Sequence, residues 1–499
     1  MFSISKRPTI KEIHTLYLEK KAKPSEVFRF FLNRSQTIDK QLNSVSSYTE
    51  NLGEKKSLEL DEILEKSTNL NEIFNQYPLF GIPCFVKSII LVEGEVFNAG
   101  SLILNNFQAP YSSTVYKKID KAGAILIGIV NMDELATGSS GETCAFGTAK
   151  NPFDKTRIPG GSSSGPAVCV ASGQCVFSLG TDTGGSIRLP AAFTDLVGLK
   201  PTYGLVSRYG VVPMASSFDQ VGPMANSVED VMIITKVLAG KDANDQTSLD
   251  SSDLLANLEK LIEQKKQTRT TSKISKTTNP LKIGIPKEFY VDGLDPIIAK
   301  AMQDLGQKLK DIGHTLIDVS VPLSKYALSV YYMIMPVELA SNLERQDGIR
   351  YAFQPQNNDG EMYFNQRDFF GDEIKRRILL GTYASSSGYY DAYYNTAQKV
   401  RALAKENFDE VFKECDVLLT PTATEFPFKL GEKSTDPLKM YLTDVLTCGI
   451  NPVRIPGLSV PLGLFEVEGT ELPTGCQLLG PEKSEDKLFT LGEEIEKLK

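Results

Sequence analysis

The chain has 499 residues and a formal net charge of −8, with 41% hydrophobic and 23% charged residues. This composition is that of an ordinary globular protein and excludes a disordered, collagen-like or membrane-spanning chain. The chain is acidic and has no dense block of Lys and Arg, so any nucleic acid involved is expected to be held by another chain. Only two histidines occur, His14 and His314, and their separation excludes a histidine-rich metal site.

The first half of the chain changes from helical to strand patterning. Residues 8–75 show helical periodicity and predict a group of N-terminal helices. The apolar run at residues 78–94 predicts buried strands. From there to about residue 240, helical stretches such as 115–123 alternate with short apolar strands such as 124–130, which is typical of a sheet covered by helices on both faces.

The second half resumes this alternation after an interruption. Residues 264–280 are rich in Lys, Thr and Ser and predict an exposed linker or insertion. A strand near 281–286, a helix near 296–312, a Tyr-rich helical section at 326–413 and a strand from 417 follow. We therefore expect a single α/β domain over residues 1–499, with a central mixed sheet covered by helices on both faces.

The cysteines and the N-terminus bear on where the protein works. Seven cysteines occur without a CxxC pair, which suits buried free thiols in a reducing compartment. The N-terminus lacks the apolar core of a signal peptide. We therefore expect a cytoplasmic protein.

Two Ser/Gly clusters are the most informative segments. Residues 160–165 read GGSSSG and residues 181–190 read TDTGGSIRLP, so Ser162 and Ser186 each lie beside a pair of glycines. Consecutive backbone N–H groups next to glycine can converge on one point and stabilise an oxyanion, and Thr183, Gly184 and Gly185 are the candidates, with the N–H of Ser186 beside them. The alternative is that both clusters are tight turns beside a helix of small residues.

Two other types of functional loop fit these segments less well. A phosphate-binding loop would need the GxxxxGK[ST] lysine, which neither segment has. Residues 161–165 match GxSxG with Ser163 at the centre, but a Ser-His triad would have to use His314. Lys87 stands inside an apolar run; if it is buried, its pKa should fall and it can act as a base, whereas on an edge strand its amine would reach water.

With residues 197–213 (VGLKPTYGLVSRYGVVP) directly following, these segments make the chain similar to the amidase signature family. The resemblance implies that Ser186 is the nucleophile, Ser162 a bridging serine with a cis peptide bond, and Lys87 the base. It also places the oxyanion hole at the backbone N–H groups of Thr183, Gly184 and Gly185. A proton would then pass from Ser186 through Ser162 to neutral Lys87, because a hydroxyl can both accept and donate.

Within this family, residues 131–135, 338–351 and 374–401 are similar to the glutaminase subunits of tRNA-dependent amidotransferases. That resemblance implies L-glutamine as substrate, with Arg377 against its α-carboxylate, Asp444 against its α-ammonium and Tyr331 beside the pocket. A zwitterionic substrate needs one fixed cation and one fixed anion. Each residue also has a plain structural alternative: a solvated helix face for Arg377, a helix position for Asp444 and a core ring for Tyr331.

The same resemblance implies the partners. Ammonia would pass to a second, tRNA-binding subunit with kinase and transamidase activity, which uses ATP and Mg²⁺, and a small third subunit would complete a heterotrimer. The tRNA would carry glutamate or aspartate. No cofactor, metal or membrane is expected for this chain. Two alternatives stay open: a stand-alone amidase acting on small amides, and an assembly subunit that has lost its chemistry.

Overall fold

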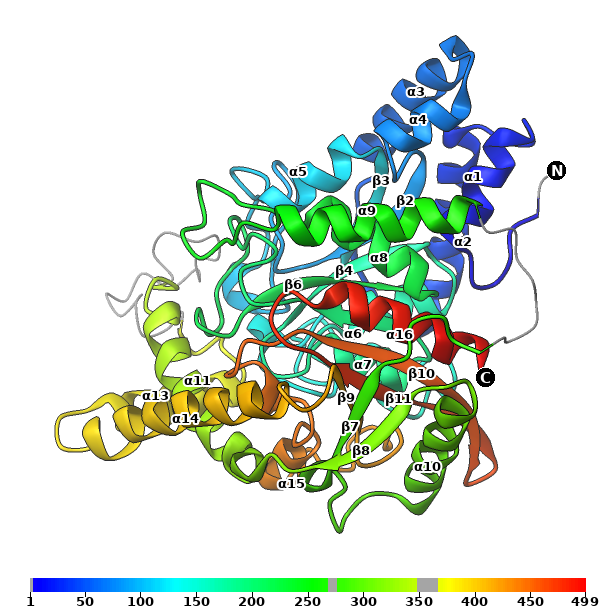
Figure 1. The fold of residues 1–499 in the computed structure, drawn as a ribbon. Coiled ribbons are helices and arrows are strands. Elements are labelled where there is room, and N and C mark those ends of the chain that lie inside the picture. Colours follow the sequence, from blue (N-terminus) through cyan, green and yellow to red (C-terminus); the bar gives the residue numbers. More distant parts are fainter. Residues whose placement is uncertain (1–2, 268–275, 348–366) are drawn as a thin grey trace, which may run out of the picture.

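The computed structural model describes residues 3–267, 276–347 and 367–499, and an 11-stranded mixed sheet runs through this part of the chain (Figure 1). The strand order is β1-β3-β2-β4-β6-β5-β10-β11-β9-β7-β8. The strands are β1 (Val45–Tyr48), β2 (Ile82–Lys87), β3 (Ala124–Val130), β4 (Phe177–Asp182), β5 (Val197–Lys200), β6 (Gln220–Ala225), β7 (Lys282–Pro286), β8 (Thr315–Val319), β9 (Val417–Pro421), β10 (Gly457–Val467) and β11 (Thr470–Leu479). Helices flank the sheet, which confirms the predicted α/β class.

The helices of the described part are α1 (Ile10–Leu18), α2 (Pro24–Leu42), α3 (Glu50–Lys66), α4 (Leu70–Gln76), α5 (Thr114–Lys121), α6 (Ser164–Ala171), α7 (Arg188–Phe193), α8 (Val228–Leu238), α9 (Ser252–Gln267), α10 (Pro296–Asp311), α11 (Ala327–Leu343), α13 (Asp372–Ser385), α14 (Thr396–Val411), α15 (Pro437–Leu442) and α16 (Glu485–Lys497). In Figure 1, α8, α9 and α16 lie together over one part of the sheet, and α13 and α14, which both pack against α11, extend from the body. None of the helices in the described residues combines the length and apolar character that a membrane span requires.

The strands that matter for the site are parallel. β2 pairs in parallel with both β3 and β4, and all three are buried at every position. A near-continuous apolar sequence is typical of such strands, because both of their faces are covered. The carboxyl ends of parallel strands meet at the same edge of a sheet, so the ends of β2 and β4, at Lys87 and Asp182, are brought together.

The N-terminal region and the expected linker differ in detail from the prediction. Helices α1 to α4 occupy most of residues 8–75, but β1 interrupts them and pairs antiparallel with β3. Four residues are too few for a strand pattern to stand out in the sequence; the free edge of β3 supplies the pairing. Helix α9 continues to Gln267, into the expected linker, and residues 268–275 lie outside the described part.

The Tyr-rich section at 326–413 is helical where it is described, in α11, α13 and α14, and residues 348–366 lie outside. All seven cysteines are free and buried: Cys84, Cys144, Cys169, Cys175, Cys415, Cys448 and Cys476.

Candidate active site

Lys87 ends β2 inside the protein, with no exposed surface. Its Nζ lies 2.8 Å from Ser162 Oγ, 2.9 Å from Ser163 Oγ and 2.8 Å from Thr181 Oγ1. Burial lowers the pKa of Lys87 to about 7, although the carboxylates of Asp133, Asp182 and Asp219 act in the opposite direction. Burial thus favours the neutral form of the lysine, which is the form that a general base requires.

The three hydroxyls around Lys87 are not equivalent. Ser163 Oγ donates to the Thr181 carbonyl at 3.0 Å, so its proton is already used and it can only accept from Lys87. A neutral amine has two protons and one lone pair, and the lone pair needs a hydroxyl donor. Ser162 and Thr181 are left as the hydroxyls able to donate to it. Ser162 follows a cis peptide bond with Gly161, as the resemblance implied.

Ser186 lies beside this cluster on the loop between β4 and α7. Its carbonyl accepts a hydrogen bond from the Ser163 N–H at 3.3 Å. Within the described residues its hydroxyl makes no hydrogen bond, and the side chain is 9% exposed. The hydroxyl thus has no hydrogen-bond partner among the described residues, and the proton path from Ser186 through Ser162 to Lys87 stays a prediction.

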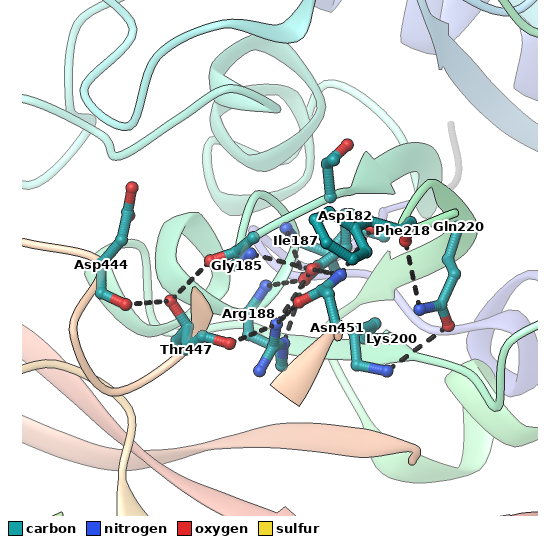
Figure 2. A network of polar contacts seen from close by, with 12 residues as sticks. Asp182, Gly185, Ile187, Arg188, Lys200, Phe218, Gln220, Asp444, Thr447 and Asn451 are labelled. Atoms are coloured by element: carbon teal, nitrogen blue, oxygen red, sulfur yellow. Dashed lines mark hydrogen bonds and ion pairs between the residues drawn. The ribbon is translucent and has the colours of Figure 1, made fainter. Parts of the chain in front are cut away.

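A buried ion pair holds this loop (Figure 2). Asp182 and Arg188 have no exposed surface and lie 2.9 Å apart. Burial alone would raise the pKa of Asp182, but Arg188 outweighs it and keeps that pKa well below its usual range. Among the further hydrogen bonds of the network, Asp182 accepts from Gly185 N (2.9 Å), Ile187 N (3.2 Å) and Asn451 Nδ2 (2.9 Å). Arg188 also donates to Gln477 Oε1 at 2.6 Å.

The hydrogen bonds of this network leave only some backbone N–H groups of the loop free to bind an oxyanion. The N–H of Gly185 already donates to Asp182, so Gly185 is not free to serve the oxyanion hole in which the sequence placed it. The amides of Thr183, Gly184 and Ser186 make no hydrogen bond within the part of the chain that the structure describes. The Thr183 side chain is fixed separately, since its hydroxyl donates to Asp219 at 2.7 Å.

Tyr331 and Arg377 come together from two packed helices, α11 and α13. The Tyr331 ring packs against Gly184, where an added Cβ would lie 2.6 Å from the ring, and stacks on Phe218 at 5.7 Å. Arg377 is 3% exposed and donates from Nε to Glu373 Oε1 at 2.7 Å. The sequence alternative of a solvated helix face therefore fits Arg376, which is 42% exposed in its side chain, and not Arg377.

Asp444 lies beyond the end of α15 and is 9% exposed. Its Oδ2 accepts from the Ser139 hydroxyl at 2.8 Å. Burial raises the pKa of Asp444 to about 7, with Ser139 and Arg377 acting in the opposite direction. The Thr447 hydroxyl links this segment to the loop that carries Ser186, with oxygen distances of 2.9 Å to the Gly184 carbonyl and 3.2 Å to the Asp444 carbonyl (Figure 2).

The sequence analysis did not predict several contacts of the site. Ser163 and Thr181 hold Lys87, Ser139 holds Asp444 and Glu373 holds Arg377. The spacing of Asp and Arg in TDTGGSIR was a signal for the Asp182–Arg188 pair. Ser139 and Glu373 had no comparable signal, because their partners are distant in sequence or lie in an ordinary helical charge pattern.

The histidine alternative does not fit this geometry. His314 precedes β8, the strand at the far end of the sheet from β2, and contacts Glu494 and the Leu281 N–H. His14 stacks on Phe74. Neither approaches Ser163, so a Ser-His triad there is wrong. Among the described residues no group of three or more His, Cys, Asp or Glu side chains is arranged to bind a metal.

The sequence also matches a known protein family. A family model described as Amidase matches residues 26–489. The chain belongs to the amidase signature family. The matched range includes all the site residues described above.

Within the family, the chain is similar along its length to the A subunits of glutamyl-tRNA(Gln) amidotransferases. It is 42% identical to that of Persephonella marina, over 98% of this chain and 97% of the relative. It is 43% identical to that of Carboxydothermus hydrogenoformans, over 97% and 96%. The crystal structure of the corresponding protein from Thermotoga maritima matches with a TM-score of 0.78 and 33% identity, covering 100% of this chain and 96% of that one. The chain is an amidase-family enzyme.

Proposed function

We propose that this chain is the glutaminase subunit of a tRNA-dependent amidotransferase and releases ammonia from L-glutamine. The observation that carries the proposal is a buried cation and a buried anion, Arg377 and Asp444, beside a loop that carries a serine with an unoccupied hydroxyl. A zwitterionic head group complements this pair, whereas a simple amide has no charged group to engage either member. The names of the relatives support the same function.

The catalytic roles follow from the contacts around Lys87. Ser186 Oγ attacks the side-chain amide carbon of glutamine; its proton passes to Ser162 as the proton of Ser162 passes to neutral Lys87. The amides of Thr183, Gly184 and Ser186 are the proposed donors to the oxyanion. Lys87 then returns a proton through Ser162 to the departing nitrogen, which leaves as ammonia. Water, activated by the same relay, cleaves the γ-glutamyl ester on Ser186 and releases glutamate.

The division of labour within the complex completes the proposal. Ammonia passes to the tRNA-binding kinase and transamidase partner, which holds the mischarged tRNA and uses ATP and Mg²⁺, and a small third protein belongs to the same heterotrimer. The net charge of −8 agrees with tRNA phosphates being met by another chain. The seven free, buried thiols agree with a cytoplasmic location.

The test is ammonia release by the chain co-purified with the proteins that bind it, from L-glutamine and from uncharged amides such as butyramide. We expect glutamine to be preferred and the activity to be lost in Ser186→Ala. Faster turnover of butyramide than of glutamine would identify a stand-alone amidase instead. Release that survives Ser186→Ala would mean that the chain only assembles the complex.

A further inference from the structure

Glu373, on the first turn of α13, is bound from two separate elements. Its Oε1 accepts from Arg377 Nε at 2.7 Å and from the Tyr441 hydroxyl of α15 at 3.0 Å. Its Oε2 accepts from Arg376. With a side chain 15% exposed, Glu373 is a carboxylate with three fixed donors, which is more than a solvated helix pair needs.

These contacts leave one edge of the Arg377 guanidinium available. Nε is bound to Glu373, Nη1 has only a weak contact with Met335 Sδ at 3.5 Å, and Nη2 has no hydrogen bond within the described residues. The rings of Tyr332 and Tyr441 stack on each other at 4.2 Å, and both centroids lie 5.6 Å from the guanidinium carbon. A carboxylate can therefore bind Arg377 through Nη1 and Nη2 in one orientation.

The same carboxylate connects Arg377 to the segment that carries Asp444. Tyr441 belongs to α15 and precedes Asp444 by less than one helical turn, and the Asp444 N–H donates to the Tyr441 carbonyl at 3.2 Å. Thr447 in turn joins Asp444 to Gly184 on the nucleophile loop. The contacts thus run without a break from the nucleophile loop through Asp444 and Tyr441 to Glu373 and Arg377.

We propose that Glu373 is a positioning residue, which sets the separation of Arg377 from Asp444 and so makes the site select amides of α-amino acids over amides with an uncharged chain. This rests on the proposed function, in which those two residues bind the α-carboxylate and the α-ammonium. Glu373 does not touch the reacting atoms. Its effect is confined to substrates that carry both charges, since only they depend on that separation.

The experiment compares Glu373→Gln with the unmodified chain, each co-purified with its partners, on L-glutamine and on butyramide. We expect KM for glutamine to rise about 10- to 100-fold because the guanidinium loses its fixed orientation. We expect kcat for glutamine, and kcat/KM for butyramide, to stay within about 3-fold of the unmodified values. Tyr441→Phe removes only the hydrogen bond between the two helices and should raise KM for glutamine by about 3- to 10-fold.

Glu62→Gln is the matched control. Glu62 forms an i,i+4 pair with Lys66 on exposed α3, so the variant makes the same charge change in the same helical spacing away from the site. We expect this variant to leave the kinetics on glutamine and on butyramide unchanged. Equal losses on both substrates in Glu373→Gln, or unchanged glutamine kinetics in Glu373→Gln and Tyr441→Phe, would overturn the positioning role.

Arg377→Ala distinguishes a failure of the Glu373 positioning role from a failure of the proposed head-group site. If Arg377→Ala weakens glutamine binding while the Glu373 and Tyr441 variants behave as the unmodified chain, the positioning proposal fails alone. If Arg377→Ala itself leaves glutamine kinetics unchanged, the proposed head-group site is wrong.

Discussion

The nucleophile loop (residues 182–188) and the proposed head-group site (Tyr331, Arg377 and Asp444) are held in place in different ways. The loop from Asp182 to Arg188 is one contiguous segment, whose two charged ends form a fully buried pair with several further hydrogen bonds. The proposed head-group site takes Tyr331, Arg377 and Asp444 from separate segments, and Glu373 connects Arg377 to Tyr441 of α15. In the proposed function, bond breaking thus depends on a locally fixed loop, and substrate choice depends on contacts between helices.

Ser186→Ala should break the first region's chemistry completely. We expect ammonia release from every amide to fall by about 10⁴-fold or more, because no other described hydroxyl has the same free position on the loop. The assay is steady-state ammonia production on glutamine and butyramide. Ser172→Ala, at the end of α6, is the control and should leave both rates unchanged. Comparable residual rates in the two variants would remove Ser186 from the mechanism.

Arg188→Ala should break the rigidity of the same loop. Removal of one member of a buried pair leaves Asp182 uncompensated and should lower the free energy of unfolding by about 3–5 kcal/mol. Chemical denaturation measures the loss, and activity on both amides should fall with it. Arg29→Ala, which breaks an exposed pair with Glu54, is the control and should have no measurable effect. A variant at Arg188 as stable as this control would contradict the account.

Arg377→Ala should affect the second region alone. The lost charge-assisted hydrogen bonds to the substrate carboxylate should reduce kcat/KM for glutamine by about 10- to 100-fold. Turnover of butyramide should persist, since that substrate has no carboxylate. The measurement is the ratio of the two kcat/KM values. An unchanged ratio would show that the Arg377 guanidinium does not bind the substrate carboxylate.

The smallest expected effect is a difference between the pH profiles for glutamine and for butyramide. Lys87 must be neutral and Asp444 ionised, and the pKa of each is about 7, so activity rises with pH for both reasons. Below pH 7, log kcat/KM should rise with a slope of about two for glutamine and about one for butyramide, which needs only Lys87. Profiles from about pH 5.5 to 8 test this, and equal slopes would exclude a role for Asp444 ionisation.

The sequence carried clearer signals for the first region than for the second. Lys87 stood out as a charge in an apolar strand, and Ser162 and Ser186 stood out beside glycine pairs. The α/β alternation gave the fold class, while β1 was missed because four residues carry too little pattern. Glu373 looked like an ordinary helical charge, since its role depends on Tyr441, which is remote in sequence. The hydrogen bond that engages the Gly185 amide likewise depends on where the Asp182 carboxylate points.

The most direct test of the proposed chemistry is to trap the acyl-enzyme. The chain, with its partners, is mixed with L-glutamine, quenched in acid during turnover, digested and analysed by mass spectrometry. We predict one γ-glutamyl group on the peptide from the nucleophile loop, attached to Ser186 and absent in Ser186→Ala. An adduct on Ser162 or Ser163, with Ser186 unmodified, would contradict the assignment of the nucleophile.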